Sequence, residues 1–117
     1  MKPKTYAPIE EIEQIHFVQW LDLKGYKYTA IPNSTYTKSI MQKMKNKRMG
    51  LRAGFPDLVV IAEGKFMCVE MKRLVNSSLS PAQKEWIEAL QAAGIPAGVC
   101  KGAEEAIAFV QGVVLSR

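Results

Sequence analysis

The chain has 117 residues, 48% hydrophobic and 23% charged, which leaves room for one domain with one core. No stretch approaches the roughly 18 apolar residues that a membrane span needs, and no N-terminal segment reads as a signal peptide. The net charge of +5 admits an anionic partner without requiring one. We therefore expect a single domain over residues 1–117. Its two cysteines lack metal-site spacing and histidine partners, which favours a reducing, cytoplasmic setting.

The first predicted helix runs from Ile9 to Lys24, and Gly25 stops it. Its apolar stripe consists of Ile12, Ile15, Val18 and Leu21, widened by Phe17 and Trp20. Three acidic residues crowd its first turns, where the helix dipole favours negative charge: Glu10, Glu11 and Glu13. His16 is the only histidine of the chain, so a histidine metal site or a hydrolase triad is not expected.

A strand over Tyr26–Ile31 and a basic helix over Thr37–Met49 come next, and Gly50 ends the helix. We expect the apolar residues of this helix to fill the core; they are Ile40, Met41 and Met44. No acidic residue occurs between Asp22 and Asp57. The charged side chains of this segment are all positive, which predicts contact with a phosphate backbone. The alternative is a basic face that is exposed to solvent. The candidates for DNA contact are Lys38, Lys43, Lys45, Lys47, Arg48 and Arg52.

The stretch after Gly54 predicts a hairpin with charged residues at one end. Asp57 opens an aliphatic run, Glu63-Gly64 interrupts it, and a second apolar run ends in Glu70 and Lys72. If Glu63 and Gly64 form a two-residue antiparallel loop, counting back places Asp57 opposite Glu70, and Lys72 shares their face. A longer loop would move Asp57 to the other face. The patch is either a buried salt-bridge cluster or a site that binds a cation.

The remaining elements are a helix, a strand and a closing helix. Ser80 is the predicted N-cap, Pro81 the first helical residue and Gln83 the second half of a capping box. The buried stripe of this helix is Trp86, Ile87, Leu90 and Ala93. A strand over Ala97–Lys101 and a helix over Ala103–Leu115 follow. The order of elements predicts an α/β fold with a mixed central sheet flanked by helices.

Pro56-Asp57 followed by Glu70-x-Lys72 resembles the PD-(D/E)xK nuclease signature. The longer pattern, in which Gly54-Phe55 precedes and Ser80-Pro81-x-Gln83 follows, resembles the VRR-NUC branch of that superfamily. The resemblance implies a restriction-endonuclease-like αβββαβ core. It also implies that Mg²⁺ or Mn²⁺ is bound by Asp57, Glu70 and the backbone carbonyl of Met71, beside a catalytic Lys72 and a nearby Gln83. A glutamate of the first helix completes such sites; Glu11 fits the family spacing best, with Glu10 and Glu13 as alternatives.

The function implied by the resemblance is metal-dependent endonucleolytic hydrolysis of DNA. Small stand-alone proteins of this kind, from phages and bacteria, act as homodimers on branched DNA such as Holliday junctions. Two active sites are needed to cut such a junction symmetrically, which a short chain provides by pairing. Two alternatives remain open. One is a DNA- or RNA-binding module without cleavage, and the other is a nuclease that acts on linear DNA ends or on RNA.

Overall fold

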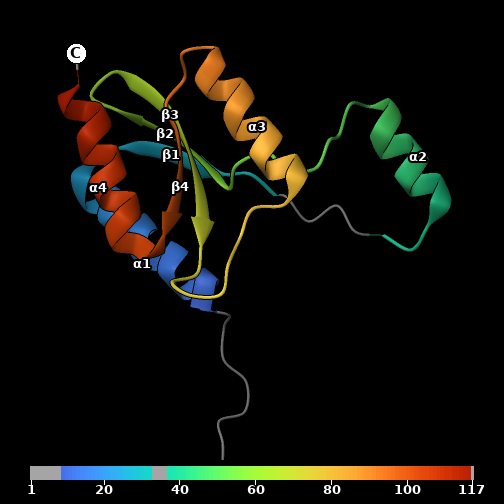
Figure 1. The fold of residues 1–117 in the computed structure, drawn as a ribbon, viewed down its shortest axis with the longest axis horizontal. Coiled ribbons are helices and arrows are strands. Elements are labelled where there is room, and N and C mark those ends of the chain that lie inside the picture. The colour runs from blue at the N-terminus through green and yellow to red at the C-terminus, as the bar shows by residue number, and fades with distance from the viewer. Residues whose placement is uncertain (1–8, 33–36, 117) are drawn as a thin grey trace, which may run out of the picture.

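The computed structural model describes residues 9–32 and 37–116. Its elements, in chain order, are α1 (Ile9–Lys24), β1 (Lys27–Ala30), α2 (Ile40–Arg48), β2 (Leu58–Ala62), β3 (Lys65–Lys72), α3 (Pro81–Ala92), β4 (Ala97–Lys101) and α4 (Gly102–Leu115). The strands form one four-stranded sheet in the order β1-β2-β3-β4 (Figure 1). β1 and β2 pair antiparallel, as do β2 and β3, whereas β3 and β4 are parallel, so the predicted mixed sheet is confirmed. No helix in the described part of the chain is long and apolar enough to cross a membrane.

The hairpin of β2 and β3 has the predicted register. Glu63 and Gly64 adopt φ angles of 51° and 78°, the left-handed conformation that a tight two-residue hairpin turn requires. Ala62 pairs with Lys65 and Leu58 pairs with Val69. The next position outward therefore brings Asp57 opposite Glu70.

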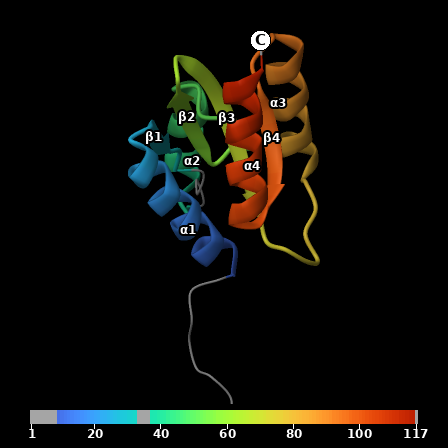
Figure 2. The same cartoon turned by 90° about the vertical axis from the view of Figure 1, so that its left-hand side faces the viewer.

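Helices cover both faces of the sheet, and each face has its own core. α1 and α4 pack on one face, as Figure 2 shows, and α3 packs on the other. The larger core lies under α1 and α4 and is built from Phe17, Leu21, Leu58, Val60, Ala62, Met67, Val69, Met71, Cys100, Ala103, Ala106, Val110 and Val113. The smaller core lies under α3 around Cys68, Ile87 and Ala97. Both cysteines are free and buried, as expected for residues of buried strands.

The predicted apolar stripe of α1 is wrong at two positions. Phe17 and Leu21 are fully buried, but Ile12 and Ile15 are 36% and 47% exposed. Phe17 and Leu21 are four residues apart and define the inward side, so Ile12 and Ile15 fall on the opposite half of the helix. In α3, Ala93 is likewise exposed, because it is the C-cap and follows the last helical turn.

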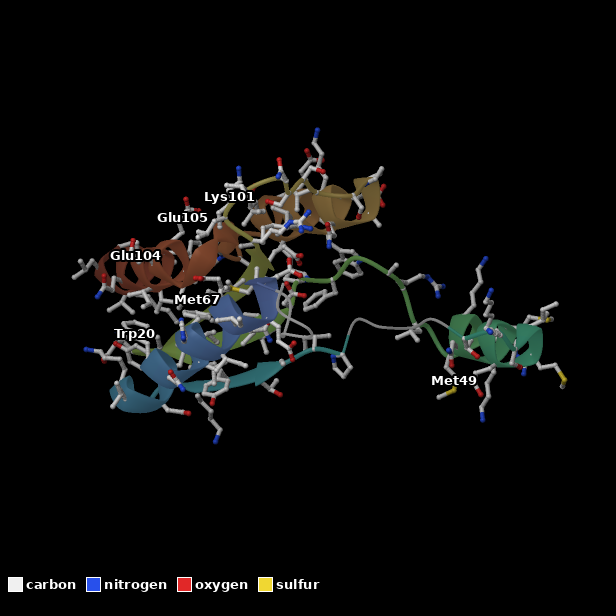
Figure 3. The ribbon with its side chains drawn as sticks, turned by 90° about the horizontal axis from the view of Figure 1, so that it is seen from below. Trp20, Met49, Met67, Lys101, Glu104 and Glu105 are labelled. Atoms are coloured by element: carbon white, nitrogen blue, oxygen red, sulfur yellow. The ribbon has the colours of Figure 1, made fainter. Side chains whose placement is uncertain are left out.

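The prediction that α2 contributes to the core is also wrong. Ser39 caps this helix by accepting a hydrogen bond from the Gln42 backbone N–H at 3.1 Å. Ile40, Met41 and Met44 are 71%, 80% and 58% exposed, and among the described residues nothing buries any side chain of α2. Figures 1 and 3 show α2, with Met49 at its end, lying apart from the sheet. A Met-rich face therefore marks an outlying arm here and not part of the core.

Candidate active site

Three of the predicted site residues meet where β2 begins and β3 ends. The Asp57 carboxylate accepts a hydrogen bond from the Met71 backbone N–H at 2.8 Å through Oδ2. Glu70 is only 2% exposed, and its Oε2 lies 3.8 Å from Lys72 Nζ. Glu70 and Lys72 are two positions apart on β3, so their side chains leave the same face. The hairpin thus gathers two acids and one lysine on one side of the sheet.

Gln83 connects this patch to the first turn of α3. Its Nε2 donates a hydrogen bond to Glu70 Oε2 at 3.0 Å. Its Oε1 accepts one hydrogen bond from Lys72 Nζ at 3.0 Å and another from the Ser80 backbone N–H at 2.9 Å. The same side chain therefore closes the predicted capping box and holds Glu70 and Lys72 in place. Neither role excludes the other, because the amide offers both donors and an acceptor.

The environment of Glu70 disfavours its ionised form. Burial raises the pKa of the Glu70 carboxyl to about 8, helped by the negative charge of Asp57. The positive charge of Lys72 lowers this pKa, while a hydrogen bond with Asp57 and the charge of Glu10 raise it further. Two neighbouring carboxyl groups with this balance can share one proton, or they can bind a cation between them.

One oxygen of Glu70 favours the interpretation that the two carboxyl groups bind a cation. Among the described residues, no donor reaches the buried Oε1 of Glu70. A buried carboxylate oxygen without a donor is costly. Two carboxylates offer the hard oxygen atoms that Mg²⁺ and Mn²⁺ prefer. The residues present therefore fit a divalent ion held by Asp57 and Glu70. Within the described ranges, no third acidic, histidine or cysteine side chain joins them as a ready ligand.

The three glutamates of α1 have different surroundings. Glu10 is half-buried and its charge acts on Glu70. Glu11, which the family spacing favours, is exposed to solvent. Glu13 accepts a hydrogen bond from the Ala103 backbone N–H at 2.7 Å and so caps α4, whose own N-cap residue makes no side-chain hydrogen bond. Of the three, Glu10 is the one whose charge raises the pKa of Glu70. The sequence does not separate Glu10 from Glu11, because the two residues are adjacent in the first turn of the helix.

Gly54 sets the distance between α3 and the hairpin. Its φ is +99°, and a Cβ there would lie 2.7 Å from the carbonyl carbon of Ala82, in the first turn of α3. The neighbouring loop binds the same helix, because Trp86 Nε1 donates to the Ala53 carbonyl at 3.0 Å. The Phe55 and Trp86 rings pack edge to face at 5.1 Å. Close approach at Gly54 therefore allows Gln83 to reach Glu70.

We predict that Gly54→Ala lowers both stability and activity. The added methyl group must push the first turn of α3 outward, so we expect the free energy of unfolding to fall by about 1–3 kcal/mol and the activity of the site to fall with it. Gly50→Ala is the matched control, since Gly50 has a similar φ of +97° but no atom within 4 Å of the added Cβ. Thermal unfolding and the catalytic rate check this. Equal behaviour of the two variants would contradict the role assigned to the close contact.

The predicted DNA-contacting residues divide into two groups. Lys43, Lys47 and Arg52 line one pocket of about 230 Å³ at the inner side of α2. Asn46 joins them and was not predicted, although its spacing of three residues from Lys43 places both on one side of the helix. Lys38, Lys45 and Arg48 are exposed elsewhere on the arm. α2, which carries Lys43, Lys45, Lys47 and Arg48, stands apart from the sheet (Figure 3). No contact given above joins these residues to the acidic patch.

Comparison with known proteins assigns the family. A profile of the VRR-NUC domain matches residues 4–104. A solved structure named as a VRR_NUC domain protein is 30% identical, with a TM-score of 0.75 over 94% of this chain and 91% of that one. A second, named as a VRR_NUC domain, is 22% identical, with a TM-score of 0.67 over 90% and 97% of the two chains, and supports the fold. No curated protein matches significantly. The chain belongs to the VRR-NUC family of nuclease domains.

Proposed function

We propose that this nuclease domain is a divalent-metal-dependent, structure-selective DNA endonuclease. The observation that carries the proposal is the state of Glu70, which is buried against Asp57 with one oxygen that no donor in the described chain reaches. Such an arrangement is unfavourable for stability alone and is typical of a site that awaits a cation.

Asp57, Glu70 and the backbone carbonyl of Met71 would hold Mg²⁺ or Mn²⁺. When bound, the ion would polarise the scissile phosphate and lower the pKa of a water molecule. Hydrogen bonds within the chain fix both acids in place. Asp57 is held by the Met71 backbone N–H, and Glu70 by the Gln83 side chain. Both acids are therefore positioned before any ligand arrives, which reduces the cost of binding.

Lys72 would stabilise the negative charge that develops on the phosphate in the transition state. Its Nζ is held by Gln83 Oε1 at 3.0 Å and lies 3.8 Å from Glu70. Because its Nζ donates to Gln83 and lies beside Glu70, we assign it an electrostatic role and not that of a general base. Gln83 acts as a positioning residue, because it orients Glu70 and Lys72 with one amide group.

Branched DNA, such as a Holliday junction, is the substrate that we propose, with the protein acting as a homodimer. The pocket of Lys43, Lys47 and Arg52 suits a phosphate group of a DNA arm that extends away from the acidic patch. A symmetric junction presents two equivalent strands, and a twofold dimer presents two equivalent active sites. Two buried free cysteines suit the reducing cytoplasm of a bacterial or phage-infected cell.

A cleavage panel tests the function. Duplex, flap, fork, four-way junction, linear ends and single-stranded RNA would each be incubated with Mn²⁺ or with EDTA, and binding would be measured in the same samples. We expect Mn²⁺-dependent internal cuts that are fastest on the four-way junction. Cleavage in EDTA would exclude a metal-dependent mechanism. Binding of every substrate without cleavage would favour a binding module, and cleavage confined to ends or to RNA would replace the proposed substrate.

We predict that Glu10→Gln lowers the cleavage rate more than Glu11→Gln does. The charge of Glu10 acts on Glu70, whereas Glu11 is exposed. We therefore propose Glu10 as the acid of α1 that assists the metal site, with an expected loss of roughly tenfold or more, which corresponds to about 1.4 kcal/mol of activation free energy. Rates measured across a Mn²⁺ titration check the order of the two variants. A larger effect of Glu11→Gln would restore the assignment that the family spacing favours.

A further inference from the structure

A pocket lies between α3 and the segment that joins α2 to β2. Its volume is about 390 Å³, and one aromatic ring, three alanines and two charged side chains line it: Arg52, Ala53, Ala82, Glu85, Trp86 and Ala89. We call it the α3 pocket. It shares Arg52 and Ala53 with the basic pocket at the inner side of α2, so the two pockets adjoin. Figure 1 shows the shared segment running from α2 to α3.

The Trp86 ring is held in place and still has an open side. Its Nε1 donates a hydrogen bond to the Ala53 carbonyl at 3.0 Å, and the ring makes an edge-to-face contact with Phe55. Ala82 and Ala89 lie four residues before and three residues after Trp86, so they are its neighbours on the surface of α3. Their methyl groups leave the space beside the half-buried ring unfilled. The orientation of this aromatic platform is therefore set before any ligand binds.

The charges of the two pockets suit different parts of a nucleotide. The charged residues that line the basic pocket are all positive, namely Lys43, Lys47 and Arg52. The α3 pocket also contains the negative charge of Glu85, so a phosphate group gains less there. A flat, uncharged base suits the space beside Trp86. Proteins that bind single strands combine in this way a positive track for the backbone with an aromatic ring for the base.

We propose that the α3 pocket binds one unpaired base of a DNA strand, stacked on Trp86, while a neighbouring phosphate of that strand lies in the basic pocket. Trp86 follows Gln83 by three residues, about 4.5 Å along the helix axis, and shares its side of α3. Gln83 contacts Glu70 and Lys72, so the bound base lies beside the acidic patch. Trp86 then selects branches that carry unpaired nucleotides. This effect on cleavage rests on the proposed nuclease function, whereas the binding of the base does not.

Tryptophan emission tests the stacking, because the chain has only two tryptophans, Trp20 and Trp86. Trp20→Phe leaves Trp86 as the sole reporter. Trp86→Phe leaves Trp20, which packs against Phe17 and Tyr26 and serves as the control. In EDTA, a single-stranded thymidine octamer at saturation should quench the emission of Trp20→Phe by roughly twofold or more and that of Trp86→Phe far less. Unchanged emission of Trp20→Phe, or equal quenching of both variants, would overturn the proposal.

Ala89→Leu fills the α3 pocket and leaves Trp86 in place. Leucine is a strong helix former, so α3 should persist. Ala92→Leu is the matched control, because it makes the same change at an exposed residue of α3 outside the pocket. We expect Ala89→Leu to weaken binding of the thymidine octamer by about tenfold or more, binding of a DNA duplex much less, and Ala92→Leu to weaken neither. Wild-type affinity of Ala89→Leu for the octamer would contradict the proposal. An equal loss for duplex and single strand would also contradict it, because the pocket would then contact the backbone.

Four-way junctions with and without unpaired thymidines at the centre connect the pocket to the reaction. With Mn²⁺, wild type should cut the junction that carries unpaired bases faster, and Ala89→Leu should cut both alike. Equal rates for wild type would refute the selection of unpaired nucleotides. Quenching of Trp86 by DNA without cleavage of any substrate would refute the proposed nuclease function and leave the base pocket standing. Metal-dependent cleavage without any response of Trp86 emission would refute the pocket and leave the nuclease function standing.

Discussion

We expect Asp57→Asn, Glu70→Gln and Lys72→Ala each to lower the rate of DNA cleavage by about 100-fold or more, while DNA binding should change little. The two acid variants remove the oxygen charge that would hold the ion, and the lysine variant removes the group that stabilises developing negative charge. Binding survives because the phosphate contacts that we propose come from the basic arm and its pocket, set apart from the patch. Single-turnover cleavage and equilibrium binding of the same junction measure the two quantities.

The matched control is Glu88→Gln, which changes an exposed glutamate of α3 in the same way as Glu70→Gln. It should retain wild-type cleavage. Circular dichroism confirms that each variant is folded. If any two of the three patch variants retain activity, the patch is not the catalytic site, whatever the family of the chain.

Glu70→Gln should also stabilise the metal-free protein, and more so as the pH rises. In the folded chain the pKa of Glu70 is about 8, whereas a glutamate in an unfolded chain titrates near its ordinary value of roughly 4.3. Between these values the folded state retains a proton that the unfolded state has lost. The contribution of Glu70 to the free energy of unfolding is therefore fully present at low pH and is lost as the pH rises towards 8. The loss is more than about 1 kcal/mol per pH unit where the folded state holds one whole proton more than the unfolded state.

Glutamine cannot ionise, so the variant escapes this loss. We expect wild type and Glu70→Gln to unfold at similar temperatures near pH 5, and the variant to unfold several degrees higher at pH 8 in EDTA. Glu88→Gln again serves as the control and should show no such dependence. A difference between wild type and Glu70→Gln that is constant with pH would mean that the Glu70 carboxyl is not held in its protonated form.

The hairpin and its site could be predicted from the sequence because local rules fix them. Glu63-Gly64 specifies a two-residue turn, the turn fixes the register, and the register places Asp57 opposite Glu70. Ser80, Pro81 and Gln83 specify the start of α3 in the same local way, and the capping box brings Gln83 near the patch. The two-sided packing of the sheet follows from the order of the elements.

The errors concern surfaces that local patterns do not distinguish. Met41 and Met44 have the composition of a core, but composition alone does not tell a core from an exposed surface that another molecule covers. Ile15 was placed in the core for the same reason. The assignment of Glu11 to the metal site stays a prediction, because the rotation of α1 that decides between Glu10 and Glu11 is set by the tertiary packing of Phe17 and Leu21.

Mn²⁺ binding followed by the paramagnetic resonance signal of the free ion addresses the carboxylate pair itself. At pH 8 and millimolar Mn²⁺, in the presence of junction DNA, wild type should remove free ion from solution in proportion to its chains, and Glu70→Gln should not. Equal removal by both proteins, or none by wild type under conditions in which it cuts DNA, would show that the buried pair of acids is not where the ion acts.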